Sequence, residues 1–211
     1  MENTTTAKLT FTDRLRVWFK WFLDPVGSFL NRIGLTPNAM TILGLAGNTV
    51  GAYFLSQGDM VKGGLFVLLM TPIDALDGTM ARLRGESSDF GAFVDSVSDR
   101  YSELIIFGGL LYHFLDHGDA LGGLLTFGAA AGSVLVSYVK ARAEALRFEA
   151  KLGILTRVER YLVLAPLLVV NQPVWAVGII AVFANITAIQ RIWHVRAQGH
   201  ARMKQSREKK S

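Results

Sequence analysis

Residues 74–82 read Asp-Ala-Leu-Asp-Gly-Thr-Met-Ala-Arg, and residues 91–99 read Gly-Ala-Phe-Val-Asp-Ser-Val-Ser-Asp. Four carboxylates therefore lie in and beside strongly apolar sequence, where an unpaired charge is costly. On a helix, Asp74 and Asp77 share one face, and so do Asp95 and Asp99. Two such helices facing each other would bring the four carboxylates together, and their mutual repulsion would require a multivalent cation. Oxygen-only ligands favour Mg²⁺ or Mn²⁺ over zinc.

The composition around this stretch is that of a membrane protein. Of the 211 residues, 51% are hydrophobic and 18% are charged, which is less charge than a soluble domain carries. The apolar segments recur without a linker, which indicates one membrane domain. The basic residues behind the net charge of +5 flank the apolar segments, so they favour a membrane surface or anionic ligands over nucleic acid. The absence of cysteine excludes disulfide and thiolate chemistry.

Six apolar segments predict an all-α integral membrane protein with six transmembrane helices. They lie near residues 40–56, 63–80, 91–114, 120–140, 161–170 and 174–193. The fifth is short for a hydrocarbon core of roughly 30 Å. It gains length if its helix extends back through Arg157 and Arg160, with these side chains facing protein.

The distribution of basic residues predicts the orientation. With both termini in the cytosol, every Lys and Arg except Lys62 falls on the cytosolic side. The positive-inside rule therefore predicts a multi-pass protein of the cytoplasmic (cell) membrane, with both termini and the active site at the cytosolic face.

The chain divides into three parts. Residues 1–35 are expected to form a cytosolic tail and a juxtamembrane amphipathic helix, residues 36–196 the six-helix domain, and residues 197–211 a basic disordered tail. Between Leu9 and Ile33, apolar residues recur at helical spacing with basic residues between them. This pattern favours an interfacial helix on the cytosolic leaflet, and packing of the helix against the bundle is the alternative.

The spacing D-x2-D-G-x2-A-R-x8-G-x3-D-x3-D over residues 74–99 resembles the signature of the CDP-alcohol phosphotransferases, which are membrane enzymes that make phospholipids. The resemblance implies two Mg²⁺ (or Mn²⁺) ions per active site. Asp74, Asp77 and Asp95 would hold the first ion. The second would be held by Asp74, Asp95 and Asp99, and Asp99 would also act as the general base. Two such metals can grip a diphosphate and orient an attacking oxygen.

By the same resemblance, a CDP-linked lipid would bind beside the metals. Gly78 and Gly91 have no side chain, so a nucleotide could lie directly against the backbone. Arg82 would contact the diphosphate. The remaining CDP-site residues would be Ser88 and the turn formed by Thr36, Pro37, Asn38 and Ala39. Thr36 or Asn38 also fits the N-cap of the first apolar helix.

A second group of motifs is basic. Residues 137–144 read Ser-Tyr-Val-Lys-Ala-Arg-Ala-Glu, residues 157–160 read Arg-Val-Glu-Arg, and residues 190–191 read Gln-Arg. Taken alone, they indicate either a pocket for a phosphate monoester or ordinary charge flanking the membrane. They resemble the bacterial phosphatidylinositol-phosphate synthases and the archaeal archaetidylinositol-phosphate synthases. That resemblance assigns the phosphate of inositol 1-phosphate to Lys140, Arg142, Arg160 and Arg191.

The expected function is therefore transfer of a phosphatidyl group from CDP-diacylglycerol to inositol 1-phosphate, with release of CMP. The family resemblance also implies a homodimer in the lipid bilayer, and no nucleic acid partner is expected. Glycerol 3-phosphate is the alternative acceptor, as in phosphatidylglycerophosphate synthase. An ion or metabolite transporter is the alternative from another class, although the acids cluster at one end and no repeat is visible. A metal-binding scaffold without catalysis is a third class. The apolar helices do not distinguish diacylglycerol from archaeol tails.

Two further features bear on packing. Glu103 continues the stripe of Asp95 and Asp99 by one helical turn, and it fits either support of the metal ligands or an ion pair with an arginine. Small residues recur in the apolar segments, among them Gly108 and Gly109, and they allow helices to approach closely.

Overall fold

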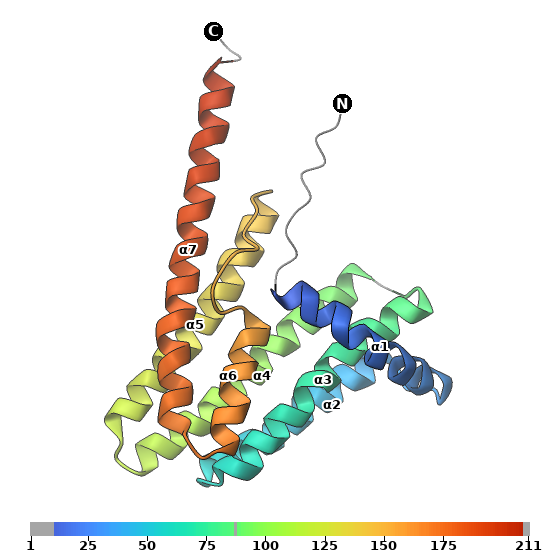
Figure 1. Ribbon diagram of the computed structural model, residues 1–211, viewed down its shortest axis with the longest axis vertical. Helices are drawn as coiled ribbons and strands as arrows, with labels where there is room; N and C mark the ends of the chain where they lie inside the picture. The colour runs from blue at the N-terminus through green and yellow to red at the C-terminus, as the bar shows by residue number, and fades with distance from the viewer. Residues whose placement is uncertain (1–10, 87, 209–211) are drawn as a thin grey trace.

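The computed structural model describes residues 11–86 and 88–208, with side chains from residue 19 onward. The described residues form seven α-helices and no strand, which confirms the all-α fold (Figure 1). The helices are α1 (Phe11–Arg32), α2 (Pro37–Ser56), α3 (Met60–Arg84), α4 (Asp89–Asp116), α5 (Ala120–Ala145), α6 (Arg157–Val169) and α7 (Pro173–Glu208).

Local sequence explains where several helices begin. The expected cap of the first apolar helix is confirmed at Thr36, whose Oγ1 accepts a hydrogen bond from the Ala39 N–H at 3.2 Å. The turns before α3 and α5 both read Gly-Asp. In the second of them, Gly118 adopts a left-handed φ of 69°, and Asp119 then accepts from the Gly122 N–H at 2.8 Å. These turns make α2–α3 and α4–α5 tight helical hairpins.

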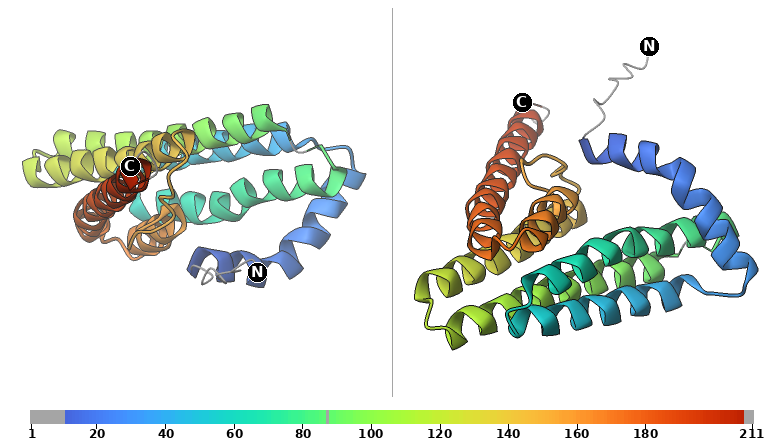
Figure 2. Two further views of the ribbon diagram at one scale, coloured as in Figure 1. Left: turned by 90° about the horizontal axis from the view of Figure 1, so that it is seen from above. Right: turned by 60° about the horizontal axis from the view of Figure 1, so that its bottom comes forward.

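The helices pack so that the short connections alternate between two ends of the bundle. The turns α2–α3, α4–α5 and α6–α7 lie along the lower edge of Figure 1. The α1–α2 and α3–α4 connections lie away from these turns, on the right of Figure 1, whereas α7 extends upward on the left (Figures 1 and 2). The acidic signature therefore lies in the halves of α3 and α4 that are away from the three tight turns.

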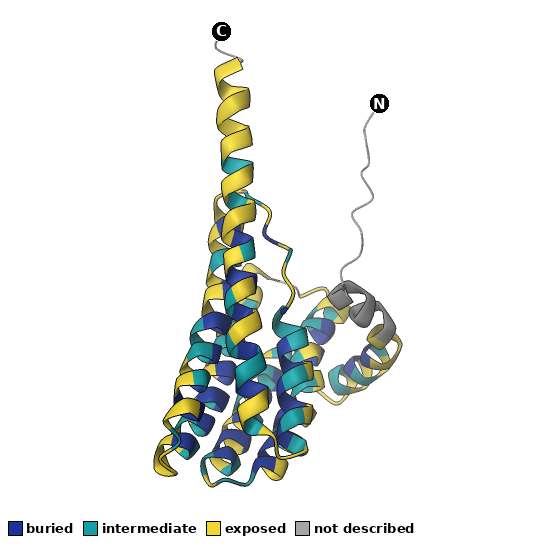
Figure 3. Ribbon diagram, turned by 60° about the vertical axis from the view of Figure 1, so that its left-hand side comes forward, coloured by how far each residue is buried: buried dark blue, intermediate teal, exposed yellow. Residues whose placement is uncertain are grey.

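Two hydrophobic cores hold these helices together. The larger core is built from residues of all the helices α2 through α7, among them the fully buried Leu55, Val67 and Leu110. Figure 3 shows buried positions along the faces that these helices turn toward one another. The smaller core joins α1 to α2 and α3, and it consists of Leu23, Met40, Leu76 and Met80.

Helix α1 therefore packs against the bundle along one face. Its other apolar side chains are exposed, and Trp21 and Phe29 are 75% and 59% accessible. Packing against the bundle, the alternative considered for this helix, is thus present. The exposed apolar side chains still leave a surface that suits a position at the membrane interface.

Within the described parts of the chain, four helices are long and apolar enough to cross a membrane, namely α2, α3, α5 and α7. Helix α4 has 28 residues, but its first half carries the acidic signature. Helix α6 has only 13 residues. It begins at Arg157 as expected, and Arg160 in its first turn is buried. A membrane protein is thus supported by four spans, and the six-span topology stays a prediction.

The expected disordered tail is wrong over most of its length. Helix α7 continues to Glu208, so residues 197–208 are helical. Hydrogen bonds from this extension to the α5–α6 loop hold it in place, and its polar composition did not indicate them. Residues 209–211 and the N-terminal residues 1–10 lie outside the described residues.

The glycines of α4 provide a test of this packing. A Cβ on Gly109 would lie 2.3 Å from the carbonyl oxygen of Ala52 in α2, whereas a Cβ on Gly108 would have nothing within 4 Å. We expect Gly109→Ala to destabilise the protein by about 1–3 kcal/mol, because backbone on both sides must move. Gly108→Ala should be neutral or stabilising by up to about 1 kcal/mol. Thermal unfolding in one detergent compares the two, and equal melting temperatures would contradict the close contact of α2 with α4.

Candidate active site

The structure brings the four signature carboxylates into one region between α3 and α4. Asp74 lies within electrostatic range of Asp77, Asp95 and Asp99, and each of these interacts with at least one further member of the group. This follows from the predicted spacing, because each helix turns two aspartates toward the same side. The two helices are adjacent along the chain and run in opposite directions, and both pack against α2, so their signature halves lie at the same end of the bundle.

Helix α2 supports two of these carboxylates. The hydroxyl of Thr41 donates to Oδ2 of Asp77 at 2.7 Å, and the Gly78 N–H donates to Oδ1 at 2.5 Å. A Cβ on Gly44 would lie only 2.1 Å from Oδ1 of Asp74, so a glycine there leaves room for the carboxylate. The sequence prediction missed Thr41 in this role. Its position three residues before Gly44, on the same helix face, is the only local signal.

Arg157, the first residue of α6, joins α3 to α4. Its Nη2 lies 3.1 Å from Oδ2 of Asp74 and 2.6 Å from Oδ1 of Asp99. A second, longer contact places Nη1 of Arg100 3.5 Å from Oδ2 of Asp99. Asp74 and Asp99 thus bind one cationic group between them. The basic motif at residues 157–160 contained Arg157, but nothing in it distinguished this residue from Arg160.

The chemistry of this donor set fits a hard divalent cation. All the donors are carboxylate oxygens, and two of them already share a positive group. The Tyr161 hydroxyl is buried beside Arg157 and has no hydrogen-bond partner among the described residues. Within residues 19–86 and 88–208, whose side chains the structure describes, no three Asp, Glu, His or Cys side chains are already close enough together to hold a metal ion. The assignment of all four aspartates as metal ligands therefore stays a prediction.

The residues expected to bind the CDP-lipid lie at the same end of α2, α3 and α4. Gly78 faces open space, since a Cβ there would meet only Nη1 of Arg82 at 3.4 Å. Arg82 is exposed, and its Nη2 donates to Oγ1 of Thr79 at 2.9 Å. Ser88 is the N-cap of α4 and accepts from the Gly91 N–H at 3.0 Å.

The turn at Thr36, Pro37, Asn38 and Ala39 is held close to the end of α3. Nε of Arg84 donates to Oδ1 of Asn31 at 2.7 Å, and its Nη2 donates to the Leu35 carbonyl at 2.5 Å. The α1–α2 connection and the last turn of α3 thus form one unit beside Arg82.

Arg160, predicted to bind the acceptor phosphate, is engaged in a buried ion pair. Its Nε and Nη2 donate to Oε1 of Glu103 at 2.9 and 2.7 Å. The two residues are 2% and 5% exposed. Of the two roles considered for Glu103, the ion pair with an arginine is the one observed.

The other three basic residues differ in their surroundings. Arg191 is 4% exposed and donates to the carbonyls of Leu152 (2.8 Å) and Val136 (2.6 Å). Its acceptors are neutral, and it lies within electrostatic range of Arg160 and Glu144.

Lys140 lies 3.9 Å from Glu144 and is partly exposed, whereas Arg142 is exposed. The structure thus places Arg160 and Arg191 near each other, with Lys140 linked to them through Glu144. No recorded contact among the described residues ties Arg142 to this group.

Comparisons with known proteins identify a family and several relatives. The family model for CDP-alcohol phosphatidyltransferase matches residues 34–189. The chain is 34% identical over 211 residues to the phosphatidylinositol phosphate synthase of Streptomyces avermitilis, covering 92% of this chain and 86% of that protein. It is 33% identical over 188 residues to the archaetidylinositol phosphate synthase of Pyrococcus horikoshii, covering 87% of this chain and 95% of the relative.

Solved structures show the same fold. A crystal structure of Mycobacterium tuberculosis phosphatidylinositol phosphate synthase with CDP-DAG bound matches with a TM-score of 0.75 at 33% identity. The match covers 82% of this chain and 92% of that one. A structure of the same mycobacterial protein in complex with manganese and citrate also matches with a TM-score of 0.75.

Proposed function

The chain belongs to the CDP-alcohol phosphatidyltransferase family, and we propose that it transfers the phosphatidyl group of CDP-diacylglycerol to inositol 1-phosphate. The products are CMP and phosphatidylinositol phosphate. The name of the Streptomyces relative supports the acceptor, and the CDP-DAG bound to the mycobacterial structure supports the donor. One observation carries the proposal. The α6 helix that places Arg157 between Asp74 and Asp99 also places Arg160 beside Arg191, so the acidic and basic groups adjoin.

Two divalent cations, Mg²⁺ or Mn²⁺, are proposed to bind Asp74, Asp77, Asp95 and Asp99. Manganese in the mycobacterial structure supports a divalent metal. When bound, such ions neutralise the diphosphate and the departing phosphate. Of the protein's own groups, Thr41 fixes the orientation of Asp77, and Gly44 leaves space for Asp74.

Asp99 is proposed as the general base. Its carboxylate faces Arg157 across 2.6 Å at the boundary between the acidic and basic groups. A carboxylate oxygen of Asp99 accepts the proton of the acceptor hydroxyl, whose oxygen then forms a bond to the lipid-linked phosphorus. The bond from that phosphorus to CMP breaks, and CMP leaves. A base must be within reach of the proton that it accepts. The contact of Asp99 with Arg157, three residues before Arg160 in the same helix, supports this role.

The acceptor phosphate is proposed to bind the basic group of Lys140, Arg142, Arg160 and Arg191. Glu103 neutralises Arg160, whereas the recorded acceptors of Arg191 are carbonyls. Glu144 and Glu159 also lie within electrostatic range of Arg191, so an acceptor phosphate would compete with these carboxylates for its guanidinium. A guanidinium offers two parallel donors to a phosphate, so Arg191 is the residue best suited to grip it.

The donor's nucleotide is proposed to lie on the open face formed by Gly78, Gly91, Arg82, Ser88 and the turn Thr36, Pro37, Asn38 and Ala39. Gly78 supports this placement because no side chain covers its backbone apart from the tip of Arg82. The lipid tails would remain among the apolar helices, which suits diacylglycerol and archaeol alike.

All six helices α2 to α7 are proposed to span the cytoplasmic membrane, with α1 at the cytosolic interface and the chain acting as a homodimer. The three tight turns at one end of the bundle support this topology, since Lys62 is the one lysine or arginine near them in the described part of the chain. The exposed aromatic side chains of α1, such as Trp21, support the interfacial position.

Release of CMP by the purified protein tests the proposal. CDP-diacylglycerol and Mg²⁺ are supplied with inositol 1-phosphate, glycerol 3-phosphate, free inositol or serine in parallel, and a CDP-archaeol series is run beside them. CMP release that requires inositol 1-phosphate is the expected result. Release only with glycerol 3-phosphate would support the transferase activity but refute inositol 1-phosphate as the acceptor. No release with any pair, in protein shown to be folded, would refute the proposal.

A further inference from the structure

The polar extension of α7 is attached to the α5–α6 loop, residues 146–156. Arg202 makes the uppermost contact. Its guanidinium donates to the carbonyls of Leu146, at 3.3 Å, and Arg147, and it stacks 4.0 Å from the ring centre of Phe148. Figure 1 shows the loop descending beside α7 from the end of α5 to the start of α6.

Gln198 makes the next contact, one helical turn before Arg202 in α7. Its Oε1 accepts from the Glu149 N–H at 3.0 Å, and its Nε2 donates to the Glu149 carbonyl at 2.7 Å. Both backbone groups of one loop residue are therefore bound by one side chain, which fixes the position and the orientation of the loop.

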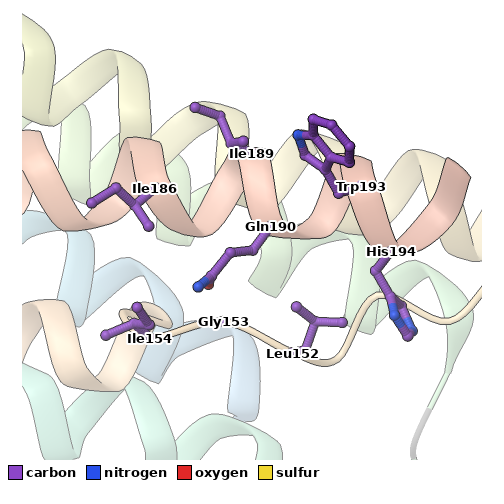
Figure 4. A pocket seen from close by; sticks show the side chains of 8 residues that line it. All are labelled: Leu152, Gly153, Ile154, Ile186, Ile189, Gln190, Trp193 and His194. Carbon is purple, nitrogen blue, oxygen red and sulfur yellow. The ribbon is translucent and has the colours of Figure 1, made fainter. Parts of the chain in front are cut away.

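The lower half of the loop is held in the same way. Besides the bond from Arg191 to the Leu152 carbonyl, Oγ1 of Thr187 accepts from the Leu155 N–H at 3.0 Å. A Cβ on Gly153 would lie 2.3 Å from Cγ2 of Thr187, so the loop lies directly against α7. Figure 4 shows the pocket between the loop and α7 that Gly153 and Gln190 help to line.

These contacts form one ordered set. Thr187, Arg191, Gln198 and Arg202 fall on one face of α7, because they are spaced by four, seven and four residues. Their partners in the loop follow in reverse order, from Leu155 down to Leu146. The loop thus runs antiparallel to α7 in a single register.

The loop also contains a conformation that needs outside support. Arg147 has a φ of 59°, in the left-handed region that disfavours residues other than glycine. Its carbonyl is one of the two bound by Arg202. The contact from α7 therefore stabilises the bend at which the chain leaves α5.

We infer that Gln198 and Arg202 are positioning residues for the acceptor site. The loop that they hold joins the α5 end carrying Lys140 to the α6 start carrying Arg157 and Arg160. Neither Gln198 nor Arg202 is among the residues proposed to touch a substrate. By fixing the loop, they set the spacing of the basic groups that receive the acceptor phosphate. This role rests on the proposed function.

Steady-state kinetics in the full-length protein test the inference. Gln198→Ala and Arg202→Ala should each raise KM for inositol 1-phosphate by roughly tenfold, because misplaced binding groups weaken acceptor binding. Values of kcat and of KM for CDP-diacylglycerol should stay within about twofold. Arg202→Lys should resemble Arg202→Ala, since a lysine keeps the charge but not the paired donors. Lys204→Ala is the matched control, because it removes an exposed basic charge two residues further on.

Hydrogen exchange supplies a readout that does not depend on the acceptor. Amides of residues 146–156 should exchange faster in Gln198→Ala and Arg202→Ala than in the wild type or Lys204→Ala. Faster exchange with unchanged KM, unchanged exchange, or wild-type behaviour of Arg202→Lys would each overturn the inference. If the wild-type enzyme uses another acceptor, the proposed function is refuted instead. Hydrogen exchange would still test whether Gln198 and Arg202 hold the loop.

Discussion

Asp99→Asn is expected to lower kcat by about 10³-fold or more while the protein remains folded. The amide has nearly the same volume as the carboxylate, but it cannot accept the acceptor's proton and carries no charge for a cation. Asp99 is 9% exposed and directly contacts Arg157, so its carboxylate lies inside the proposed site rather than at the surface. Acceptor-dependent CMP release measures the loss.

Asp89→Asn is the matched control for this variant. Asp89 lies in the first turn of the same helix, is exposed, and is absent from the signature. It should retain wild-type kcat. Residual activity above about a tenth of the wild type in Asp99→Asn would refute the assignment of the general base.

Removing one partner of the Glu103–Arg160 pair should destabilise the protein strongly. Glu103→Leu leaves a guanidinium that is 2% exposed without its carboxylate, and the expected cost is about 3–5 kcal/mol. The double variant Glu103→Leu/Arg160→Met removes both charges, so most of this stability should return. Thermal or denaturant unfolding of the wild type, the two single variants and the double variant forms a complete double-mutant cycle.

The double variant also separates packing from acceptor binding. Arg160 is proposed to bind the acceptor phosphate in addition to its contact with Glu103. The stable double variant should therefore show little CMP release at inositol 1-phosphate concentrations that saturate the wild type. Lys151→Ala, which removes an exposed charge from the α5–α6 loop, should retain wild-type kinetics. Wild-type KM in a stable double variant would show that Arg160 has a packing role only.

The sequence was sufficient to predict the helices and the grouping of the carboxylates. Apolar runs bounded by caps such as Thr36 give the helix boundaries, and spacings of three and four residues place two aspartates on one face of each helix. The predicted extension of the short fifth apolar segment through Arg157 and Arg160 is also present, since α6 begins at Arg157 and Arg160 is buried.

The rest depended on how helices align with one another, which local periodicity does not encode. Thr41 and Gly44 meet α3 only through the register of two packed helices. Arg157 and Arg160 looked alike in sequence, yet one turns to the aspartates and the other to Glu103. The segment after residue 196 was expected to be disordered because it is basic and polar. Its partners lie about 50 residues away in the α5–α6 loop, so the local sequence did not indicate them.

Identification of the lipid product tests the central proposal most directly. The protein is incubated with CDP-diacylglycerol, inositol 1-phosphate and Mg²⁺, and the extracted lipids are analysed by mass spectrometry beside a parallel reaction with glycerol 3-phosphate. The expected result is phosphatidylinositol phosphate in an amount equal to the CMP released, with no product in the parallel reaction. Phosphatidylglycerophosphate as the only product, or no new lipid from folded protein, would contradict it.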